Sequence, residues 1–372
     1  MNLQDIFDSR KNKPEWNTSY PLHPNDWKQY RCPEPLSFHK EKVLSYYVHV
    51  PFCRQLCSFC EYSRMKCPNE DLQHLYIEVL ERDIISFINQ YYDIPLNGFD
   101  IGGGTPTSLS DDNFSRLLGL YRGIVSQLRI TEDFEPSIEG SFSTITPAKI
   151  EAIANAGINR ISLGMQSASS NILTQNNRVT KSFEDMASVL NVIHSFGIRK
   201  INLDLMYGLR SQTLQSLSAD IAAIKILNPE QVTLYELRTN MINQQTAWNK
   251  DMLYEAYCYL YAQLTALGYN ARFGQNTFSK EAHDLGVSSY LRHRMIDGTG
   301  YKGFGISAQS MCSEGLSYNI GKTSTLTNKI IESPTYKPEY IYKLPPQELA
   351  AKYILKSATI IQYTIKGRFM SR

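Results

Sequence analysis

Residues 46–60 read YYVHVPFCRQLCSFC, a short apolar run followed at once by three cysteines. The run is rich in β-branched and aromatic residues, which is typical of a buried strand. Cys53, Cys57 and Cys60 then occur in the spacing C-x3-C-x2-C. An iron–sulfur cube is usually held by four cysteine thiolates, so a loop with three would leave one iron open to another ligand. The spacing therefore predicts a [4Fe-4S] cluster with one open iron.

An open iron can chelate the amino and carboxylate groups of S-adenosylmethionine (SAM), whose C–S bond breaks when an electron enters the sulfonium. The competing interpretation is a structural zinc ion. Zinc takes four ligands, usually in two spaced pairs. His49 or Cys67 could complete such a set, but the sequence has no second C-x2-C pair. The spacing thus favours the cluster.

Composition narrows the class of protein. The 372 residues carry a net charge of +2, which favours neither nucleic acid nor an anionic membrane as a partner. No run approaches the roughly 20 apolar residues that span a bilayer, and residues 1–16 lack the apolar core of a secretory signal. We therefore expect a cytoplasmic protein. Clustered cysteines in that compartment indicate metal or redox chemistry rather than disulfides.

The remaining four cysteines are expected to be ordinary thiols: Cys32, Cys67, Cys258 and Cys312. Cys258 falls in a helical pattern over residues 251–267, and we predict that it points into the core.

Short apolar runs alternate with helical patterns along the chain. The runs are residues 46–50, 98–101, 137–140, 160–163, 201–206 and 231–235. Thr146-Pro147 is typical of a helix start and Gly157 of its end. A second helix is predicted to begin near Ser182 and to end at Gly197. Strands alternating with helices predict an α/β fold with a parallel sheet, here a (β/α)6-type partial barrel.

In such a barrel, functional residues lie at the carboxyl ends of the strands. The cysteine loop follows the first predicted strand, and residues 102–107, GGGTPT, follow the second. Glu139 lies at the third, Gln166 follows the fourth and Asp204 lies within the fifth. The motifs and the fold therefore indicate the same edge of the sheet.

These motifs resemble a known family. Residues 47–53, YVHVPFC, and residues 102–107 are similar to the radical SAM enzymes grouped around oxygen-independent coproporphyrinogen III oxidase. That group includes the heme chaperone HemW, anaerobic heme-degrading methyltransferases and class C radical SAM methyltransferases. The resemblance covers roughly residues 17–320, including NRISLGMQS at 159–167, DLMYGL at 204–209 and GFGISA at 303–308.

The resemblance implies roles for individual residues. Cys53, Cys57 and Cys60 would hold the cluster, and Gln166 and Tyr62 would lie at the catalytic centre. The implied SAM contacts are Tyr47, Phe59, Gly103, Gly104, Thr105, Glu139, Gln166, Arg178 and Asp204. Arg238 and Gln309 fall where some relatives bind a second SAM. Reduced flavodoxin or ferredoxin is the implied electron donor.

The sequence departs from the family pattern at three places. The oxidase has a fourth cysteine two residues after the triplet, where this chain has Tyr62. The usual Pro-Gly-Gln-Thr becomes RSQT at 210–213. We expect an N-terminal arm over 1–40, the partial barrel over 41–240 and a barrel-completing, substrate-side segment over 241–320. Residues 321–372 resemble only the beginning of the family's C-terminal helical domain.

Three functions stay open at this point. The first is a radical SAM enzyme that acts on a tetrapyrrole or another conjugated substrate, with a second SAM serving methyl transfer. The second is a HemW-like heme-binding chaperone, for which His194 and His293 are candidate heme ligands. The third is an oxygen-independent coproporphyrinogen III oxidase, which the absence of the fourth cysteine disfavours.

Overall fold

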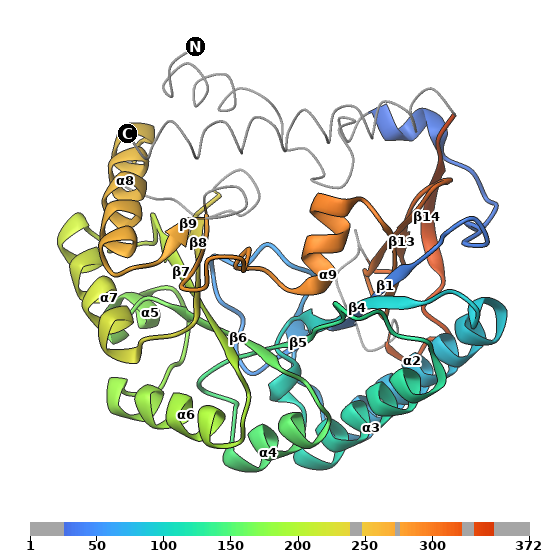
Figure 1. The fold of residues 1–372 in the computed structure, drawn as a ribbon, viewed down its shortest axis with the longest axis horizontal. Helices are drawn as coiled ribbons and strands as arrows, with labels where there is room; N and C mark the ends of the chain where they lie inside the picture. The colour runs from blue at the N-terminus through green and yellow to red at the C-terminus, as the bar shows by residue number, and fades with distance from the viewer. Residues whose placement is uncertain (1–25, 239–247, 272–275, 322–330, 346–372) are drawn as a thin grey trace.

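The computed structural model describes residues 26–238, 248–271, 276–321 and 331–345 (Figure 1). The expected N-terminal arm and C-terminal region therefore lie partly outside the described residues. Residues 26–30 form a short 3-10 helix, η1 (Asp26–Tyr30). No helix in the described ranges is both long enough and apolar enough to cross a membrane.

All six predicted strands are present and run parallel to one another. They are β1 (Leu44–Val50), β4 (Leu96–Gly103), β5 (Pro136–Gly140), β6 (Arg160–Gln166), β7 (Lys200–Tyr207) and β8 (Gln231–Glu236). A seventh parallel strand, β11 (Gly300–Phe304), pairs with β1 and was not predicted. The sheet order is β11-β1-β4-β5-β6-β7-β8, so the strands form an open arc. The predicted α/β class with a partial barrel is confirmed.

Antiparallel strands extend the sheet at both ends. Beyond β11 come β12 (Gln309–Cys312), β13 (Gly315–Asn319) and β14 (Pro338–Lys343), and beyond β8 come β10 (Thr277–Ser279) and β9 (Asn270–Ala271). A separate small pair joins β2 (Phe52–Cys53) to β3 (Met65–Lys66). Segments from the last third of the chain thus lie at both ends of one sheet.

Helices cover the convex side of the arc (Figure 1). They are α2 (Glu70–Tyr91), α3 (Asp111–Gln127), α4 (Pro147–Asn155), α5 (Ser170–Gln175), α6 (Phe183–Ser195), α7 (Leu214–Leu227) and α8 (Lys250–Ala266). The predicted helix starts are confirmed, because the Thr146 and Ser182 side chains accept from the backbone N–H groups of Lys149 and Asp185. Gly157 and Gly197, at the predicted ends, both have a φ of +78°.

The main core lies between these helices and the sheet. Strand residues such as Ile138, Ile161 and Leu203 are fully buried there together with Leu80 and Leu117 of the helices. The prediction that Cys258 points into this core is wrong, because its side chain is exposed on α8. Helical periodicity placed the helix correctly but did not distinguish its two faces, since α8 carries tyrosines on both.

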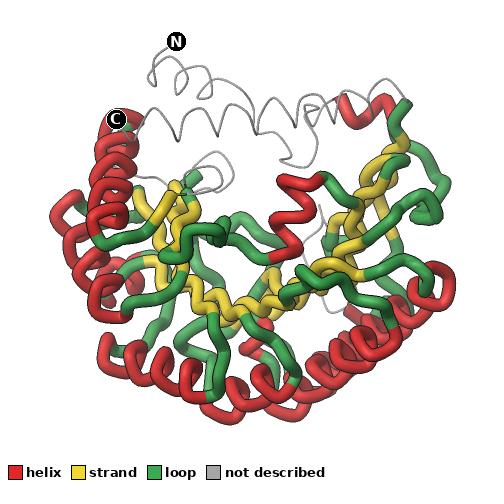
Figure 2. Tube along the Cα trace, viewed as in Figure 1, coloured by secondary structure: helices red, strands yellow, loops and turns green. Residues whose placement is uncertain are grey.

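The concave side of the arc is polar. Arg160 of β6 is buried and donates to Ser137 Oγ at 2.9 Å and to Gln231 Oε1 at 2.8 Å. Next to it, Asn202 Nδ2 donates to Ser162 Oγ at 2.9 Å. A short helix, α9 (Ser289–Arg292), also lies on this side, as Figure 2 shows. Alternate strand residues point to opposite faces, so each strand supplies apolar residues to the helices and polar residues to the interior.

Candidate active site

The three cysteines of the motif lie in one loop at the carboxyl end of β1. Cys53 belongs to β2, and the loop returns through β3, where the Cys67 N–H donates to Cys53 O at 2.8 Å. Arg64 Nη2 donates to Cys57 O at 2.7 Å and closes the loop from the other side. Cys53 and Cys57 are buried, Cys60 is half-buried, and all three are free thiols.

Donor groups from distant segments point at these sulfurs. Thr105 Oγ1 donates to Cys53 Sγ at 3.6 Å, and Arg178 Nη1 donates to Cys57 Sγ at 3.6 Å. Burial raises the pKa of Cys53 to about 11, against the opposing effect of Thr105 and the positive charge of Arg64. Buried thiols of this kind lose their protons when a metal binds, because the metal stabilises the thiolate.

The arrangement fits an iron–sulfur cluster better than a single ion. Within the described parts of the chain, no three His, Cys, Asp or Glu side chains converge closely enough to hold one metal ion. A cube of iron and sulfide separates its ligand sulfurs more widely than one tetrahedral ion does. The three thiols, their N–H and O–H donors and the nearby Arg64 and Arg178 suit such a cube, whose properties depend on hydrogen bonds to sulfur and on local charge.

The glycine motif packs directly on the cysteine loop. Gly104 N–H donates to Val50 O at 2.8 Å, and Thr105 N–H donates to Phe52 O at 2.7 Å. A Cβ on Gly104 would lie 2.7 Å from the Pro51 carbonyl carbon. Gly103 has a φ of +110°, and its Cβ would meet the His49 ring at 2.5 Å. Only glycine allows this close approach of two backbones, which explains the motif physically.

Two carboxyl groups lie beside the glycine motif. Glu139 Oε2 accepts from Gly103 N–H at 2.9 Å, and Asp204 Oδ1 accepts from Asn202 Nδ2 at 2.8 Å. Desolvation inside the barrel raises the pKa of Asp204 to about 7, and the charge of Glu139 adds to this rise. Desolvation also raises the pKa of Glu139, against the Gly103 hydrogen bond. The ammonium and sulfonium charges of SAM would stabilise both carboxylates.

Gln166 and Arg178 lie at the end of β6 and in the loop beyond α5. Gln166 adopts a φ of +68°, which is uncommon outside glycine and is often found at functional sites. Its Oε1 and the Nε of Arg178 are buried and have no hydrogen-bond partner among the described residues. Arg178 also donates to Gly164 O. Unpartnered polar atoms of this kind are expected where a polar ligand binds.

Three aromatic residues that were predicted to belong to the site lie in or near the cysteine loop: Tyr47, Phe59 and Tyr62. The Tyr47 hydroxyl is 3.3 Å from His49 Nδ1, and the Tyr47 ring stacks on Tyr290. Phe59 packs on an apolar cluster of Ile172, Met206, Leu209 and Leu237. Tyr62 is 58% exposed and lies within electrostatic range of Cys60, Glu139 and Asp204.

Arg238 and Gln309, the predicted second-SAM contacts, have partners within the protein. Arg238 forms an ion pair with Glu61, the residue after Cys60. Gln309 Oε1 accepts from Arg294 at 2.8 Å, and its Nε2 donates to Tyr318 Oη at 2.6 Å. Arg238 and Gln309 therefore interact with different sets of side chains in this structure.

Sequence reasoning missed four charged residues of the site: Glu61, Arg64, Asp100 and Arg160. Glu61 and Arg64 lie beside the cysteine triplet, where charged neighbours were a usable signal. Asp100 interrupts the apolar strand before the glycine motif, and Arg160 begins the next strand but one. A charged residue inside a strand pattern indicates either a sheet edge or a polar interior.

The two histidines considered as heme ligands lie elsewhere. His194 Nε2 pairs with Glu230 at 3.2 Å, and His293 Nδ1 pairs with Asp297 at 2.7 Å and its Nε2 with Asp133 at 3.4 Å. Glu230 precedes β8 and Asp133 precedes β5, so both histidines lie at the edge where strands begin. That edge is opposite to the cysteine loop.

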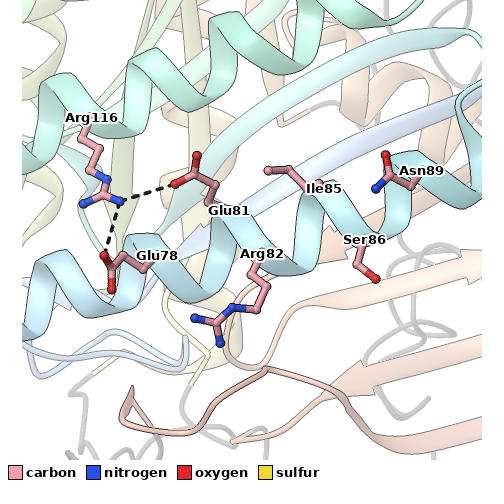
Figure 3. A pocket seen from close by; sticks show the side chains of 7 residues that line it. All are labelled: Glu78, Glu81, Arg82, Ile85, Ser86, Asn89 and Arg116. Carbon is pink, nitrogen blue, oxygen red and sulfur yellow. Dashed lines mark hydrogen bonds and ion pairs between the residues drawn. The ribbon is translucent and has the colours of Figure 1, made fainter.

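A hollow on the outer surface lies far from these residues. It is formed by α2 and α3, where Arg116 pairs with Glu78 at 3.7 Å and with Glu81 at 3.4 Å (Figure 3). Its lining combines charged side chains with Ile85, Ser86 and Asn89. The chemistry therefore belongs to the carboxyl edge of the sheet and not to this hollow.

Comparison with known proteins supports the same class. Residues 47–223 match the model of the Radical SAM superfamily. The heme chaperone HemW of Bacillus subtilis is 30% identical over 193 residues, which cover 52% of this chain and 50% of HemW. The oxygen-independent coproporphyrinogen III oxidase of Salmonella typhimurium is 29% identical over 325 residues, which cover 81% of this chain and 69% of the oxidase.

A solved structure shows the shared fold. Coproporphyrinogen III oxidase (HemN) from Escherichia coli superposes with a TM-score of 0.75 at 23% identity, covering 94% of this chain and 83% of that chain. The fold and the site define a radical SAM enzyme. The chain carries a radical SAM domain over residues 47–223, and it is similar to both HemN and HemW. It spans only about half the length of its HemW relative.

Proposed function

We propose that this chain cleaves SAM reductively at a [4Fe-4S] cluster on Cys53, Cys57 and Cys60 and acts on a tetrapyrrole or a similar conjugated substrate. When bound, the cluster and SAM together supply the electron and the 5′-deoxyadenosyl radical that abstracts hydrogen. The observation that carries the proposal is the contact between the two loops. The glycine motif lies on the cysteine loop, and Glu139 accepts from Gly103 N–H beside it.

The remaining residues would bind and orient SAM. Gly103, Gly104 and Thr105 would offer carbonyl oxygens to its ammonium group, because their N–H groups already donate to Glu139, Val50 and Phe52. Glu139 and Asp204 would accept from its ribose hydroxyls or its ammonium group. Gln166 and Arg178 would use their unpartnered atoms, Oε1 and Nε, in the same site.

The substrate class rests on the relatives and on the concave face. The oxidase relatives are named for coproporphyrinogen III, a tetrapyrrole, and match about four-fifths of this chain. Tyr62 and Tyr235 expose 58% and 40% of their surface, and Tyr235 has Asp204 and Glu139 as electrostatic neighbours. Open aromatic rings beside the SAM residues can pack against the pyrrole rings of a tetrapyrrole.

The reaction we favour is methyl or methylene transfer with a second SAM, rather than oxidative decarboxylation. The chain has Tyr62 where the oxidase pattern has its fourth cysteine. Arg238 and Gln309 would contact the second SAM after leaving their present partners, Glu61 and Arg294. Reduced flavodoxin or ferredoxin would supply the electron.

The test is anaerobic reconstitution with iron and sulfide, followed by SAM and dithionite, with coproporphyrinogen III or heme added. Mass spectrometry quantifies 5′-deoxyadenosine and S-adenosylhomocysteine. Both products together support two-SAM transfer, and 5′-deoxyadenosine alone supports a single-SAM oxidase. The absence of both products from protein with an intact cluster spectrum would rule the enzyme proposal out.

A heme chaperone is the second candidate, because the HemW relative matches half of this chain at 30% identity. Heme binding would need an axial ligand other than His194 and His293, which lie at the opposite edge of the sheet. Stable heme binding without either SAM product would favour this candidate.

A further inference from the structure

Asp100 of β4 is one of the charged residues of the site, and no contact with the cluster or with SAM has been assigned to it. It lies two positions before Gly102, so its side chain points to the same concave face as the glycine motif. Its Oδ2 accepts from Ser288 Oγ at 2.5 Å. Its Oδ1 is buried and accepts no hydrogen bond from any residue that the structure describes. An unsatisfied buried oxygen of this kind costs about 1–3 kcal/mol unless a ligand or solvent supplies a donor.

The residues around Asp100 come from four elements of the barrel. In the sheet register it lies beside Tyr47 of β1 and Ser137 of β5. Its charged and titratable neighbours are Tyr47, Glu135, Glu139, Arg160 and Tyr290. Arg160 directs its described N–H donors to Ser137 and Gln231, so it makes no hydrogen bond to this carboxyl group.

A purely structural role for Asp100 uses only one of its oxygens. Ser288 is the N-cap of α9, and its Oγ accepts from Leu291 N–H at 3.2 Å. The Ser288 hydroxyl donates its own proton to Asp100 Oδ2. This contact anchors α9 to the sheet but leaves Oδ1 without a function.

We propose that Asp100 is a substrate-binding residue whose Oδ1 accepts a hydrogen bond from an N–H group of the substrate. This inference rests on the proposed function, in which the substrate is a tetrapyrrole. In a porphyrinogen the pyrrole N–H groups can turn to one face of the flexible macrocycle, where a carboxyl oxygen reaches them. In the oxidised porphyrin the inner N–H groups lie in the ring plane and are much less accessible. Asp100 would therefore favour the reduced macrocycle.

The substitution Asp100→Asn tests this role while keeping the shape of the side chain. Since Ser288 donates its proton, the new amide must turn its oxygen toward Ser288 and its NH2 group toward the substrate. A donor would then face the pyrrole N–H groups. The matched variant Ser288→Ala removes the α9 contact and leaves both oxygens of Asp100 in place.

The experiment uses the full chain with its cluster reconstituted, under anaerobic conditions and at matched cluster content. Equilibrium dialysis measures the dissociation constants of coproporphyrinogen III and of coproporphyrin III. We expect the unmodified protein and Ser288→Ala to bind the porphyrinogen about tenfold more tightly than the porphyrin. We expect Asp100→Asn to reduce that preference to less than about threefold.

The outcomes separate this inference from the proposed function. Equal binding of both probes by the unmodified protein, or an unchanged preference in Asp100→Asn, would overturn the role of Asp100. A loss of preference in Ser288→Ala as large as that in Asp100→Asn would overturn it too, because the effect would then come from α9. If the unmodified protein binds neither probe, the proposed substrate class fails, and the inference fails with it.

Discussion

Arg178 donates a hydrogen bond to the sulfur of Cys57 at 3.6 Å, although 121 positions separate the two residues. Arg178 lies beyond β6 and α5, whereas Cys57 lies in the loop after β1. The same guanidinium also donates to Gly164 O, which holds it between β6 and the cysteine loop. The contact therefore joins the cluster loop to the opposite side of the predicted SAM site.

Removing this contact should lower the reduction potential of the cluster. A positive charge and an N–H donor beside a ligand sulfur stabilise the reduced form, which carries one more negative charge. We expect Arg178→Met to shift the potential by about −30 to −100 mV, measured by an EPR-monitored redox titration. Arg210→Met, on an exposed loop, is the control, and an equal potential in both variants would contradict the assignment.

Replacing a cysteine of the motif should remove the cluster, whereas replacing the neighbouring Cys67 should not. Cys57→Ser should abolish the cluster, because only two thiolates would remain in the loop. Cys67 contacts Ser108 O and Gln73 instead, so Cys67→Ser should keep its cluster. Iron and acid-labile sulfide per chain measure both. Cluster loss in Cys67→Ser would show that the ligand set is wrong.

Gly103→Ala should destabilise the protein and weaken SAM binding. The new Cβ would lie 2.5 Å from the His49 ring, in a backbone conformation that alanine rarely adopts. We expect a loss of about 2 kcal/mol or more in unfolding free energy. Gly119→Ala, within helix α3 and with nothing near its Cβ, should be neutral or stabilising. Thermal unfolding and SAM titration compare the two, and equal effects would refute the steric argument.

Asp204→Asn should stabilise the protein at high pH only. The pKa of Asp204 is raised from 3.8 to about 7, so the folded state holds its proton more tightly than the unfolded state. Stability from this group is therefore full below pH 4 and is lost as the pH rises to 7. The variant should gain about 1–3 kcal/mol over the unmodified protein at pH 8 and little at pH 4.

The control for that experiment is Asp251→Asn, at the exposed start of α8. Thermal midpoints at several pH values provide the comparison. A gain for Asp204→Asn that does not change with pH would show that the carboxyl group is already ionised in the folded protein near neutral pH.

Lys149→Met should loosen the turn that follows the glycine motif. Lys149 is 8% exposed, and its Nζ donates to Thr107 O at 2.8 Å and to Leu109 O at 2.7 Å. Its loss would leave two carbonyl groups unsatisfied, at a cost of about 2–4 kcal/mol. Chemical denaturation measures this against Lys225→Met on the exposed face of α7. A cost below about 0.5 kcal/mol would show that the carbonyl groups find other donors.

The strands and helix starts were predictable because their signals are local. Apolar runs placed six strands, and Thr146 and Ser182 capped helices as their side-chain chemistry requires. The strand β11 was not predictable, since its sequence GYKGF carries two glycines and a lysine. It is a strand because β1 offers an open edge, which is a tertiary condition.

In the candidate site, too, some features were predictable from the local sequence and others depend on the tertiary structure. The cysteine spacing and the glycine motif determined the predicted cluster and SAM chemistry without any structure, because both depend on residues adjacent in sequence. Only the tertiary structure paired Arg178 with Cys57, Arg238 with Glu61 and Asp100 with Ser288. Such contacts join segments that the strand order brings together. The neighbours of a side chain across a sheet depend on the register and curvature of the strands, and the local sequence around that residue does not determine them.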